Sequence, residues 1–296
     1  MKSNTIFMNR LNLSKKQLIL IIIFLGIYFI GSFLIFNVPI SVKSTIGLKT
    51  TTDDGVIISF NVFEPVCLGN NKKAVIIGHG SMANKEMMQS YAIELAAAGF
   101  VAVPFDFRGH GQSTGERGTG NLTSDIRAIK DYLNTRADID INNLGYIGLS
   151  MGGIGQEVIN EDLDFKCFIG TATWLYDDLR KGNSSNPLNV LMVEAKYDEI
   201  IDIEYIKEAV SNRTGVPVVN VNKLYGSFHE GNATQIYYDD NSNHIFAQWD
   251  IDFVREARNW VINTFPDVKQ EDENFYAQIR LIILVVQLFG GIGFFF

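Results

Sequence analysis

The feature that most constrains the fold of this chain is residues 148–152, Gly-Leu-Ser-Met-Gly, a G-x-S-x-G pattern centred on Ser150. The apolar run 144–149 predicts a buried strand before the serine, and residues 154–160 can form a helix after it. A serine at such a tight turn is lifted clear of the sheet, and glycines flank it because side chains there would collide with their neighbours. Ser150 is therefore a candidate nucleophile. The alternative is a glycine-rich turn with an idle serine.

Apolar runs and helical stretches alternate through the middle of the chain, which predicts an α/β fold with a doubly wound, mostly parallel sheet. Residues 56–63 alternate in polarity and predict an antiparallel strand at the start, whereas the later runs are continuously apolar, as in strands buried on both faces. The expected parallel strands are residues 74–77, 101–105, 144–149, 165–169, 189–193 and 216–221. The expected helices are residues 85–98, 122–135, 151–160, 202–211 and 249–264.

An uncharged apolar segment at residues 18–36 predicts a transmembrane anchor, since about 20 apolar residues cross a bilayer. A cleaved signal peptide would have a shorter apolar region and a small-residue cleavage site, and residues 36–39, Phe-Asn-Val-Pro, are a poor one. Residues 1–17 contain four basic residues and no acid, so we expect a cytoplasmic tail. The rest of the chain would then lie on the extracytoplasmic side.

A second apolar segment occupies residues 279–296 and is interrupted by Gly290, Gly291 and Gly293, which weaken a helix. It could be a second membrane span, an interfacial segment or the beginning of a longer element. A core helix of the globular domain is less favoured, because the polar run 270–274 separates it from the preceding helix.

Composition limits the classes of partner. The 296 residues are 47% hydrophobic, enough for one large core, and one globular domain plus membrane segments is the simplest organisation. The net charge of −8 argues against a nucleic-acid partner, which needs a basic surface. Cys167 lies in an apolar run, so a buried free thiol is favoured over a disulfide with Cys67.

Four stretches in order resemble motifs of the α/β-hydrolase superfamily, over roughly residues 45–266. Residues 78–82, Gly-His-Gly-Ser-Met, resemble its oxyanion loop, and residues 106–113, Asp-Phe-Arg-Gly-His-Gly-Gln-Ser, resemble its D-x-R-G-x-G-x-S loop. The turn at 148–153 resembles its nucleophile elbow, and Asp198 follows a later strand where the family keeps its acid. Within the superfamily the chain is most similar to membrane-anchored members of the dienelactone-hydrolase and prolyl-peptidase-like branch.

The resemblance implies a catalytic triad of Ser150, Asp198 and His244, which follow one another in the family's order. A serine hydroxyl needs an imidazole to take its proton and a carboxylate to hold that imidazole in the correct tautomer. The oxyanion would be bound by the backbone N–H of Met151 and by an N–H from the turn at Ser81 and Met82.

Each of these assignments has competitors in the sequence. Glu194, Glu199 and Asp202 are alternative acids, although Asp202 is better explained as the cap of the next helix. His229 is the alternative base, but it falls in the turn of an expected hairpin, whereas His244 lies in a polar loop just before the last helix.

Other polar residues are interpreted as structural. His79 is expected to brace the oxyanion loop, and Arg108 and His110 are expected to be tied to Asp106. Residues 237–240, Tyr-Tyr-Asp-Asp, lack a cluster of ligand-spaced side chains, so no metal is predicted. No phosphate-binding glycine loop is present, so no nucleotide cofactor is implied.

Together these features predict a membrane-anchored serine hydrolase that cleaves carboxylic esters through an acyl-enzyme on Ser150, without a cofactor. A peptidase or thioesterase on the same fold is the nearest alternative, and an anchored, non-catalytic binding protein is an alternative of another class. The expected partners are a small ester or peptide substrate and the lipid bilayer. The sequence does not determine the oligomeric state.

Overall fold

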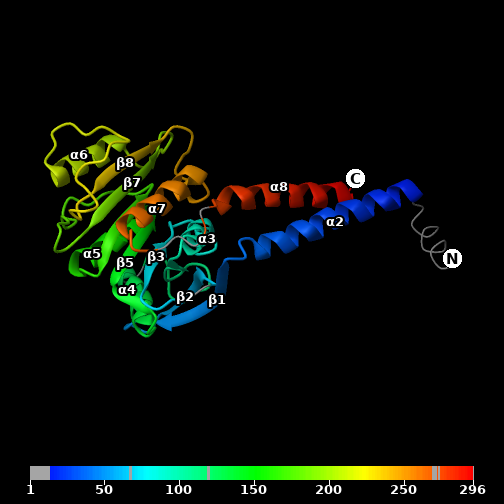
Figure 1. Cartoon of the computed structure of the whole chain (residues 1–296), viewed down its shortest axis with the longest axis horizontal. Helices are drawn as coiled ribbons and strands as arrows, with labels where there is room; N and C mark the ends of the chain where they lie inside the picture. The colour runs from blue at the N-terminus through cyan, green and yellow to red at the C-terminus, as the bar shows by residue number, and fades with distance from the viewer. Residues whose placement is uncertain (1–13, 67–68, 119–120, 269–271, 273, 296) are drawn as a thin grey trace. The chain divides into compact units, whose positions relative to one another are not determined.

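The computed structural model describes residues 14–66, 69–118, 121–268, 272 and 274–295, and they form two compact units (Figure 1). One unit contains the two long helices near the chain ends, and the other is Ser41–Phe275. Most of the expected basic tail, together with Cys67, lies outside the described residues. The other cysteine, Cys167, is a buried free thiol.

The larger unit is built on an eight-stranded sheet in the order β1-β2-β4-β3-β5-β6-β7-β8. β1 (Val42–Thr51) and β2 (Ile57–Pro65) form an antiparallel hairpin, and β2 is also antiparallel to β4 (Val101–Phe105). All remaining pairs are parallel. This confirms the expected sheet with its antiparallel N-terminal strands. The other strands are β3 (Lys72–Gly78), β5 (Ile139–Leu149), β6 (Phe165–Thr171), β7 (Asn189–Ala195) and β8 (Thr234–Asp239).

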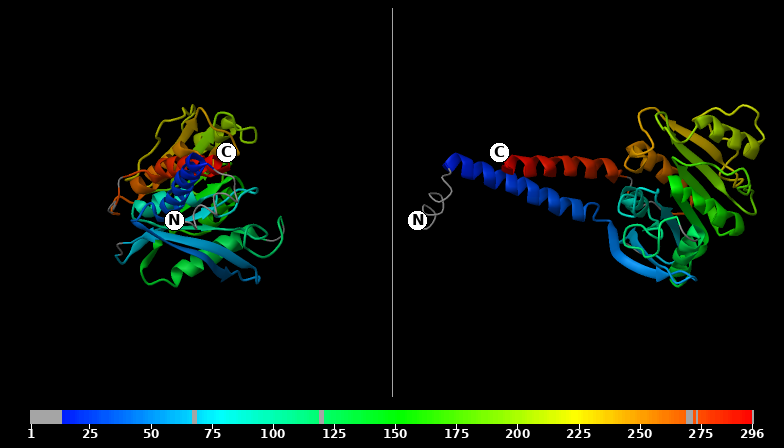
Figure 2. Two further views of the ribbon diagram at one scale, coloured as in Figure 1. Left: turned by 90° about the vertical axis from the view of Figure 1, so that its right-hand side faces the viewer. Right: turned by 180° about the vertical axis from the view of Figure 1, so that it is seen from behind.

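Helices cover both faces of this sheet (Figure 2). In the strand order, α3 (Gln89–Ala97) connects β3 to β4, which lies on the β2 side of β3. The later crossovers run in the opposite direction, toward β8. Because such crossovers are right-handed, α3 lies on the opposite face from the rest. α7 (Ile251–Thr264) packs against α3. The other face carries α4 (Leu122–Asn134), α5 (Gly155–Glu161) and α6 (Ile203–Thr214).

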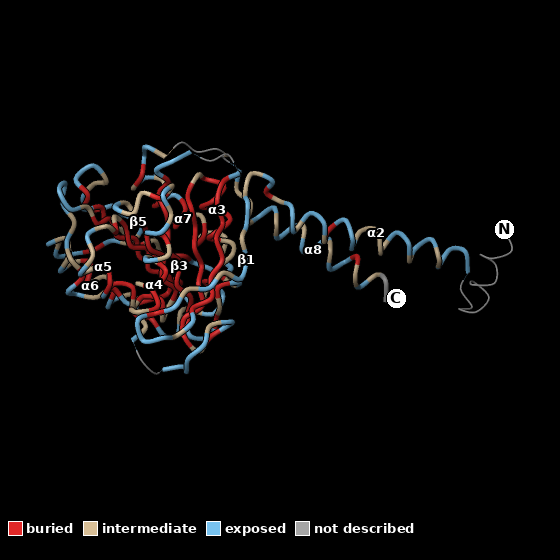
Figure 3. Tube along the Cα trace, turned by 90° about the horizontal axis from the view of Figure 1, so that it is seen from below, coloured by how far each residue is buried: buried red, intermediate tan, exposed pale blue. Residues whose placement is uncertain are grey.

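The core follows the central strands. Every residue of β3, β4 and β7 is buried, as expected for strands covered on both faces. Figure 3 shows the buried residues gathered along the central strands and the helices that cover them. Such a core fixes the strand ends, and with them the loops that hold the polar residues described below.

Two sequence predictions about elements are wrong. Residues 216–221 do not form a strand, and the last strand is β8. Pro217 lacks an N–H for a ladder hydrogen bond, and Val218 is 70% exposed, so this run is not a buried strand. The helix expected over 85–98 begins only at Gln89, because the preceding residues form i→i+3 turns, in which the N–H groups of Met88 and Gln89 donate to the carbonyl oxygens of Lys85 and Glu86.

The candidate site residues gather at one edge of the sheet. Parallel strands run in one direction, so their carboxyl ends lie together. The loops after β3, β5, β7 and β8 carry respectively residues 79–82, Ser150, Asp198 and His244.

The smaller unit is a pair of helices, α2 (Lys15–Asn37) and α8 (Tyr276–Phe295), which run antiparallel. Glycines allow the two helices to approach closely, because a Cβ added at Gly31 would collide with Gln287 and one added at Gly293 would collide with Phe24. The Gln287 amide donates to the Ser32 hydroxyl over 2.8 Å, which pairs two polar groups on otherwise apolar helices.

By length and composition, both helices could cross a membrane. Within α2 only Gly31 is buried, so its large apolar side chains are mostly not covered by protein. At the carboxyl end of α2, Arg280 of α8 donates to the carbonyl oxygens of Ile35 and Val38, each over 2.7 Å. These contacts satisfy backbone groups where α2 ends.

Candidate active site

Ser150 sits at the turn from β5 into a short 3-10 helix, η1 (Ser150–Ile154), with a positive φ of 48°. Such a conformation is strained for a residue with a side chain and persists because its surroundings hold it. A Cβ on Gly148 would lie 2.5 Å from the Gly152 carbonyl oxygen, and one on Gly152 would lie 2.5 Å from that of Gly78. Both glycines of the pattern are therefore sterically required, as the sequence analysis expects.

A continuous hydrogen-bond path joins the three expected triad residues. The Ser150 hydroxyl lies 2.9 Å from His244 Nε2, and His244 Nδ1 lies 2.8 Å from Asp198 Oδ2. With Nδ1–H donating to the carboxylate, Nε2 is free to accept the serine proton. His244 lies in the loop after β8, where the Asn243 side chain accepts from the N–H groups of Ile245 and Phe246.

Asp198 is positioned by the turn after β7. Its other oxygen, Oδ1, accepts 2.8 Å hydrogen bonds from the N–H groups of Ile200 and Ile201. Burial alone would raise the pKa of Asp198, but the hydrogen bonds from His244 and from these N–H groups outweigh it and hold the pKa below its ordinary value. Asp198 is thus ionised at neutral pH.

The competing residues are placed elsewhere. Asp202 accepts from the N–H of Glu204 and caps α6, as expected. The His229 side chain is 93% exposed and contacts Glu230, so it is not brought to Ser150. Glu194 lies in β7, buried, rather than facing His244.

The expected oxyanion loop lies directly against the serine. A Cβ on Gly80 would be 3.3 Å from that of Ser150. Buried His79 accepts from the Phe107 N–H at Nε2 and donates from Nδ1 to the Gly80 carbonyl, so it braces this loop. Burial lowers the pKa of His79 to about 4, which keeps the ring neutral.

The N–H groups that would bind an oxyanion in this loop are available. Within the described part of the chain, the backbone N–H groups of Ser81 and Met82 have no hydrogen-bond acceptor. The Ser81 carbonyl oxygen lies 3.1 Å from His110 Nε2, which turns the carbonyl toward the imidazole. The Met82 side chain is 86% exposed and contributes little to the fold.

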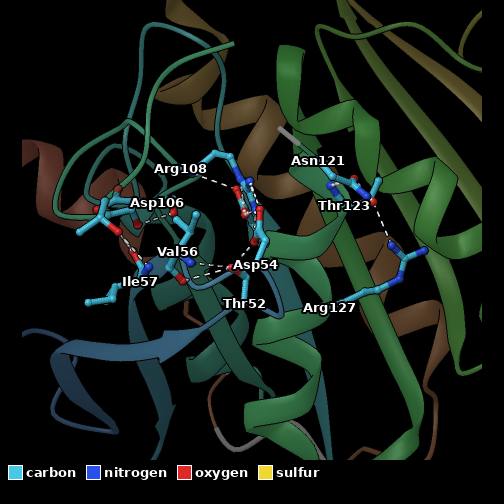
Figure 4. Close-up of polar contacts among 12 residues, drawn as sticks. Thr52, Asp54, Val56, Ile57, Asp106, Arg108, Asn121, Thr123 and Arg127 are labelled. Atoms are coloured by element: carbon cyan, nitrogen blue, oxygen red, sulfur yellow. Dashed lines mark hydrogen bonds and ion pairs between the residues drawn. The ribbon is translucent and has the colours of Figure 1, made fainter. Parts of the chain in front are cut away.

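The expected ties of Arg108 and His110 to Asp106 are wrong, although both residues are structural. Asp106 is held by Lys85, whose ammonium lies 2.6 Å from Oδ2. Arg108 instead donates to Asp125 of α4. It also donates to Asp54 in the β1–β2 turn (Figure 4). Its guanidinium hydrogen bonds lower the pKa of Asp54 to about 2.

A group of polar residues behind the serine carries no signal in the sequence. The Thr173 hydroxyl donates to the Ser150 carbonyl oxygen over 2.7 Å, and its N–H points to Glu194 Oε1 at 3.4 Å. The buried Gln156 amide donates to the carbonyl oxygens of Gly153 and Trp174. Because these residues are far apart in sequence and match no pattern, only the folded chain relates them.

A carboxylate cluster was also not foreseen. Oxygen atoms of Asp239, Asp250 and Asp252 lie within 4.8 Å of one another where β8 and α7 approach. Asp250 accepts from the Asp252 and Phe253 N–H groups as the cap of α7, and Asp252 pairs with Arg255. These structural roles account for the positions of two of the three carboxylates.

Residues 69–196 match a protein family described as serine aminopeptidase, S33. An uncharacterised protein of Mycobacterium tuberculosis is 30% identical over 101 residues, covering 34% of this chain and 36% of that protein. An uncharacterised 31.7 kDa protein of Escherichia coli is 33% identical over 105 residues, with 34% and 35% covered. The chain thus spans about a third of the length of these curated relatives.

Solved structures are similar over most of the chain. An esterase of Pyrococcus furiosus aligns with a TM-score of 0.58 at 18% identity, covering 78% of this chain and 93% of that one. An α/β serine hydrolase without a lid from Xanthomonas campestris aligns with a TM-score of 0.53 at 18% identity, covering 76% and 94%. At this identity the likeness establishes the fold.

Proposed function

We propose that this chain, which has the α/β-hydrolase fold, is a serine hydrolase that cleaves carboxylic esters through an acyl-enzyme on Ser150. The observation that supports this most directly is the hydrogen-bond path from the Ser150 hydroxyl through His244 to Asp198. A non-catalytic binding protein would not need this path, nor a serine held at a positive φ between glycines.

In the proposed mechanism, His244 Nε2 removes the Ser150 proton as the oxygen attacks the ester carbonyl. Asp198 holds the imidazole and stabilises its positive charge. The backbone N–H of Met151 and those of the Ser81–Met82 turn would bind the oxyanion, and each such donor contributes about 2.7–4 kcal/mol to the transition state. As the tetrahedral intermediate collapses, His244 gives this proton to the departing alcohol, and the acyl-enzyme remains on Ser150. Water then attacks the acyl-enzyme with His244 acting again as the base, and the proton returns to the Ser150 oxygen as the carboxylic acid is released.

A peptidase or thioesterase would use the same residues, and the family that residues 69–196 match is described as an aminopeptidase. The lining of the hollow beside Ser150 contains no charged residue, which disfavours an aminoacyl substrate with a free α-ammonium group and is compatible with an uncharged ester. The alcohol part of the substrate is left open by these residues.

We further propose that the hydrolase is anchored in a membrane by α2 and α8. Both helices have the length and composition to span a membrane. The side chains of Gln287 and Ser32 hydrogen bond to each other across the pair, and polar groups in a lipid environment need such partners. With the basic tail in the cytoplasm, the domain would be extracytoplasmic, and an antiparallel α8 would return to the cytoplasmic side.

A fluorophosphonate probe tests the catalytic proposal on the full-length protein in detergent. We expect the probe to label Ser150 alone and to block hydrolysis of p-nitrophenyl acetate, and Ser150→Ala to abolish both. If Ser150→Ala still binds the probe and still hydrolyses the ester, Ser150 is not the nucleophile and the catalytic proposal fails. If the wild type neither binds the probe nor hydrolyses the ester, the binding-protein alternative is favoured. Ser184→Ala, in the exposed loop after β6, is the matched control and should behave as the wild type.

A further inference from the structure

A hollow of about 340 Å³ opens beside Ser150, at the small end of the range for small-molecule sites. Most of its lining is aliphatic or aromatic, and none of the lining residues is charged. They are Leu122, Ser150, Met151, Ile154, Thr173, Trp174, Tyr176, Ile200 and Ile201. Its position next to the serine makes it a candidate substrate subsite.

The walls of this hollow are fixed to the nucleophile turn. The Thr173 hydroxyl bonds the Ser150 carbonyl, and the Gln156 side chain bonds the Trp174 carbonyl and accepts from the Tyr176 N–H over 2.9 Å. Gln156 is fully buried, so these bonds are shielded from water. The segment 172–176 is therefore held at a set distance from the reacting oxygen, and its side chains can discriminate substrates by size.

The residues that line the hollow indicate which half of an ester it can hold. The leaving alcohol must receive its proton from His244 Nε2, and His244 does not line the hollow. Ser150 and Met151, which would hold the carbonyl carbon and the oxyanion, do line it. The group that enters is consequently the one attached to the carbonyl carbon, the acyl group.

The residues that line the hollow also indicate that the acyl group carries no charge. An α-ammonium buried here would lack a carboxylate partner, and a buried unpaired charge is costly. The nearest carboxylates whose charges act on the Tyr176 phenol are Glu157 and Asp178, and both are exposed and outside the lining.

Building on the proposed function, we propose that this hollow is an acyl subsite for uncharged, apolar acyl chains, and that Trp174 limits their length. Trp174 has the largest side chain among the lining residues and packs edge-on against Tyr205, with ring centroids 5.3 Å apart. Its side chain is 36% exposed, so it can be shortened without leaving a cavity in the core.

Two variants of the full-length protein test the assignment with p-nitrophenyl acetate, butyrate, hexanoate and octanoate. In the wild type, kcat/KM should rise about 10-fold or more from acetate to a medium chain, because each methylene in an apolar pocket adds to discrimination. Leu122→Trp should fill the hollow and remove this rise, so that the ratio of kcat/KM for octanoate to kcat/KM for acetate falls by about 10-fold or more relative to the wild type. Trp174→Ala should move the optimum to longer chains.

Leu163→Ala is the matched control, since Leu163 is an exposed apolar residue in the turn before β6, at the other edge of the sheet. Its chain-length profile should equal that of the wild type. An unchanged profile in both Leu122→Trp and Trp174→Ala would overturn the subsite. So would a profile in which these variants respond to the size of the alcohol in alkyl acetates rather than to the acyl chain.

A separate experiment tests the aminopeptidase alternative. Preferential hydrolysis of aminoacyl p-nitroanilides that Glu157→Gln or Asp178→Asn abolishes would show that the hollow receives an ammonium group, and would overturn the proposal. Failure of the proposed function is distinguishable, because then no p-nitrophenyl ester would be hydrolysed in a manner dependent on Ser150.

Discussion

Glu194 and Asp198 lie four residues apart at the end of β7, and the pKa values of their carboxyl groups are displaced in opposite directions. Burial, together with the negative charge of Asp198, raises the pKa of Glu194 well above its ordinary value. Asp198 is also partly buried, but hydrogen bonds from His244 and from backbone N–H groups hold its pKa down. One carboxyl group is therefore neutral and the other charged, and the charged one faces the histidine.

Glu194→Gln should make the protein more resistant to unfolding at neutral pH. In the folded state Glu194 keeps a proton that the unfolded chain releases above its ordinary pKa of about 4.5. Its raised pKa therefore lowers stability progressively as the pH rises above that value, by at most about 1.4 kcal/mol per pH unit. The neutral amide removes this dependence and keeps an oxygen for the Thr173 N–H.

Urea unfolding of wild type and Glu194→Gln between pH 4 and pH 8 measures this effect. The two should agree near pH 4, and the variant should become increasingly more stable toward pH 8. A difference independent of pH would mean that Glu194 is ionised in the folded protein. Glu199→Gln, which changes an exposed carboxylate in the loop after β7, should show no such trend.

His244→Ala should lower kcat for p-nitrophenyl acetate by several orders of magnitude, because the base that contacts Ser150 is lost. His229→Ala should retain most of the activity, since its side chain is 93% exposed and contacts Glu230 instead. Steady-state kinetics on both variants, with circular dichroism to check folding, is the measurement. The reverse pattern would move the base to the loop at residue 229.

Gly152→Ala should destabilise the domain and abolish activity. A Cβ at this position would lie 2.5 Å from the carbonyl oxygen of Gly78, which belongs to β3 and cannot move without disturbing the sheet. Overpacking of this kind costs about 1–3 kcal/mol. Gly69→Ala is the control, because a Cβ there meets no atom within 4 Å. Equal melting temperatures for the two variants would contradict the steric explanation of the pattern.

The proposed membrane topology predicts which parts of the chain are accessible from outside. A specific protease site inserted between Ser184 and Ser185, in an exposed loop, should be cut in intact cells. An epitope tag after Phe296 should be reached only after permeabilisation, because α8 runs antiparallel to α2. Protection of the loop until lysis would reverse the orientation. An accessible tag together with a cleavable loop would show that α8 does not cross.

A hydrogen bond between α2 and α8 allows a second test of the proposed membrane anchor. Gln287→Leu removes the hydrogen bond to the Ser32 hydroxyl, and such bonds between membrane helices contribute about 0.6–2 kcal/mol. A small loss of thermal stability in detergent, with esterase activity unchanged, is the expected result. Loss of activity at full thermal stability would instead connect this contact to the site.

The sequence alone determined the sheet class and the position of the candidate nucleophile, Ser150. The spacing of Gly148, Ser150 and Gly152 is a local steric requirement, and continuous apolar runs mark strands buried on both faces, so both are readable without the fold. The same local reasoning was wrong at residues 216–221, where apolar residues are interrupted by Pro217.

Only the tertiary structure decided which histidine meets Ser150 and which carboxylate holds that histidine, because His244 and Asp198 lie 94 and 48 positions from the serine along the chain and are brought together by the strand order. The same holds for Thr173 and Gln156, which fix the hollow beside the serine, and for Lys85, which takes the partner expected for Arg108. Hydrogen bonds and burial depend on distances in space. A pattern of residue types encodes those distances only where neighbours in sequence are also neighbours in the fold.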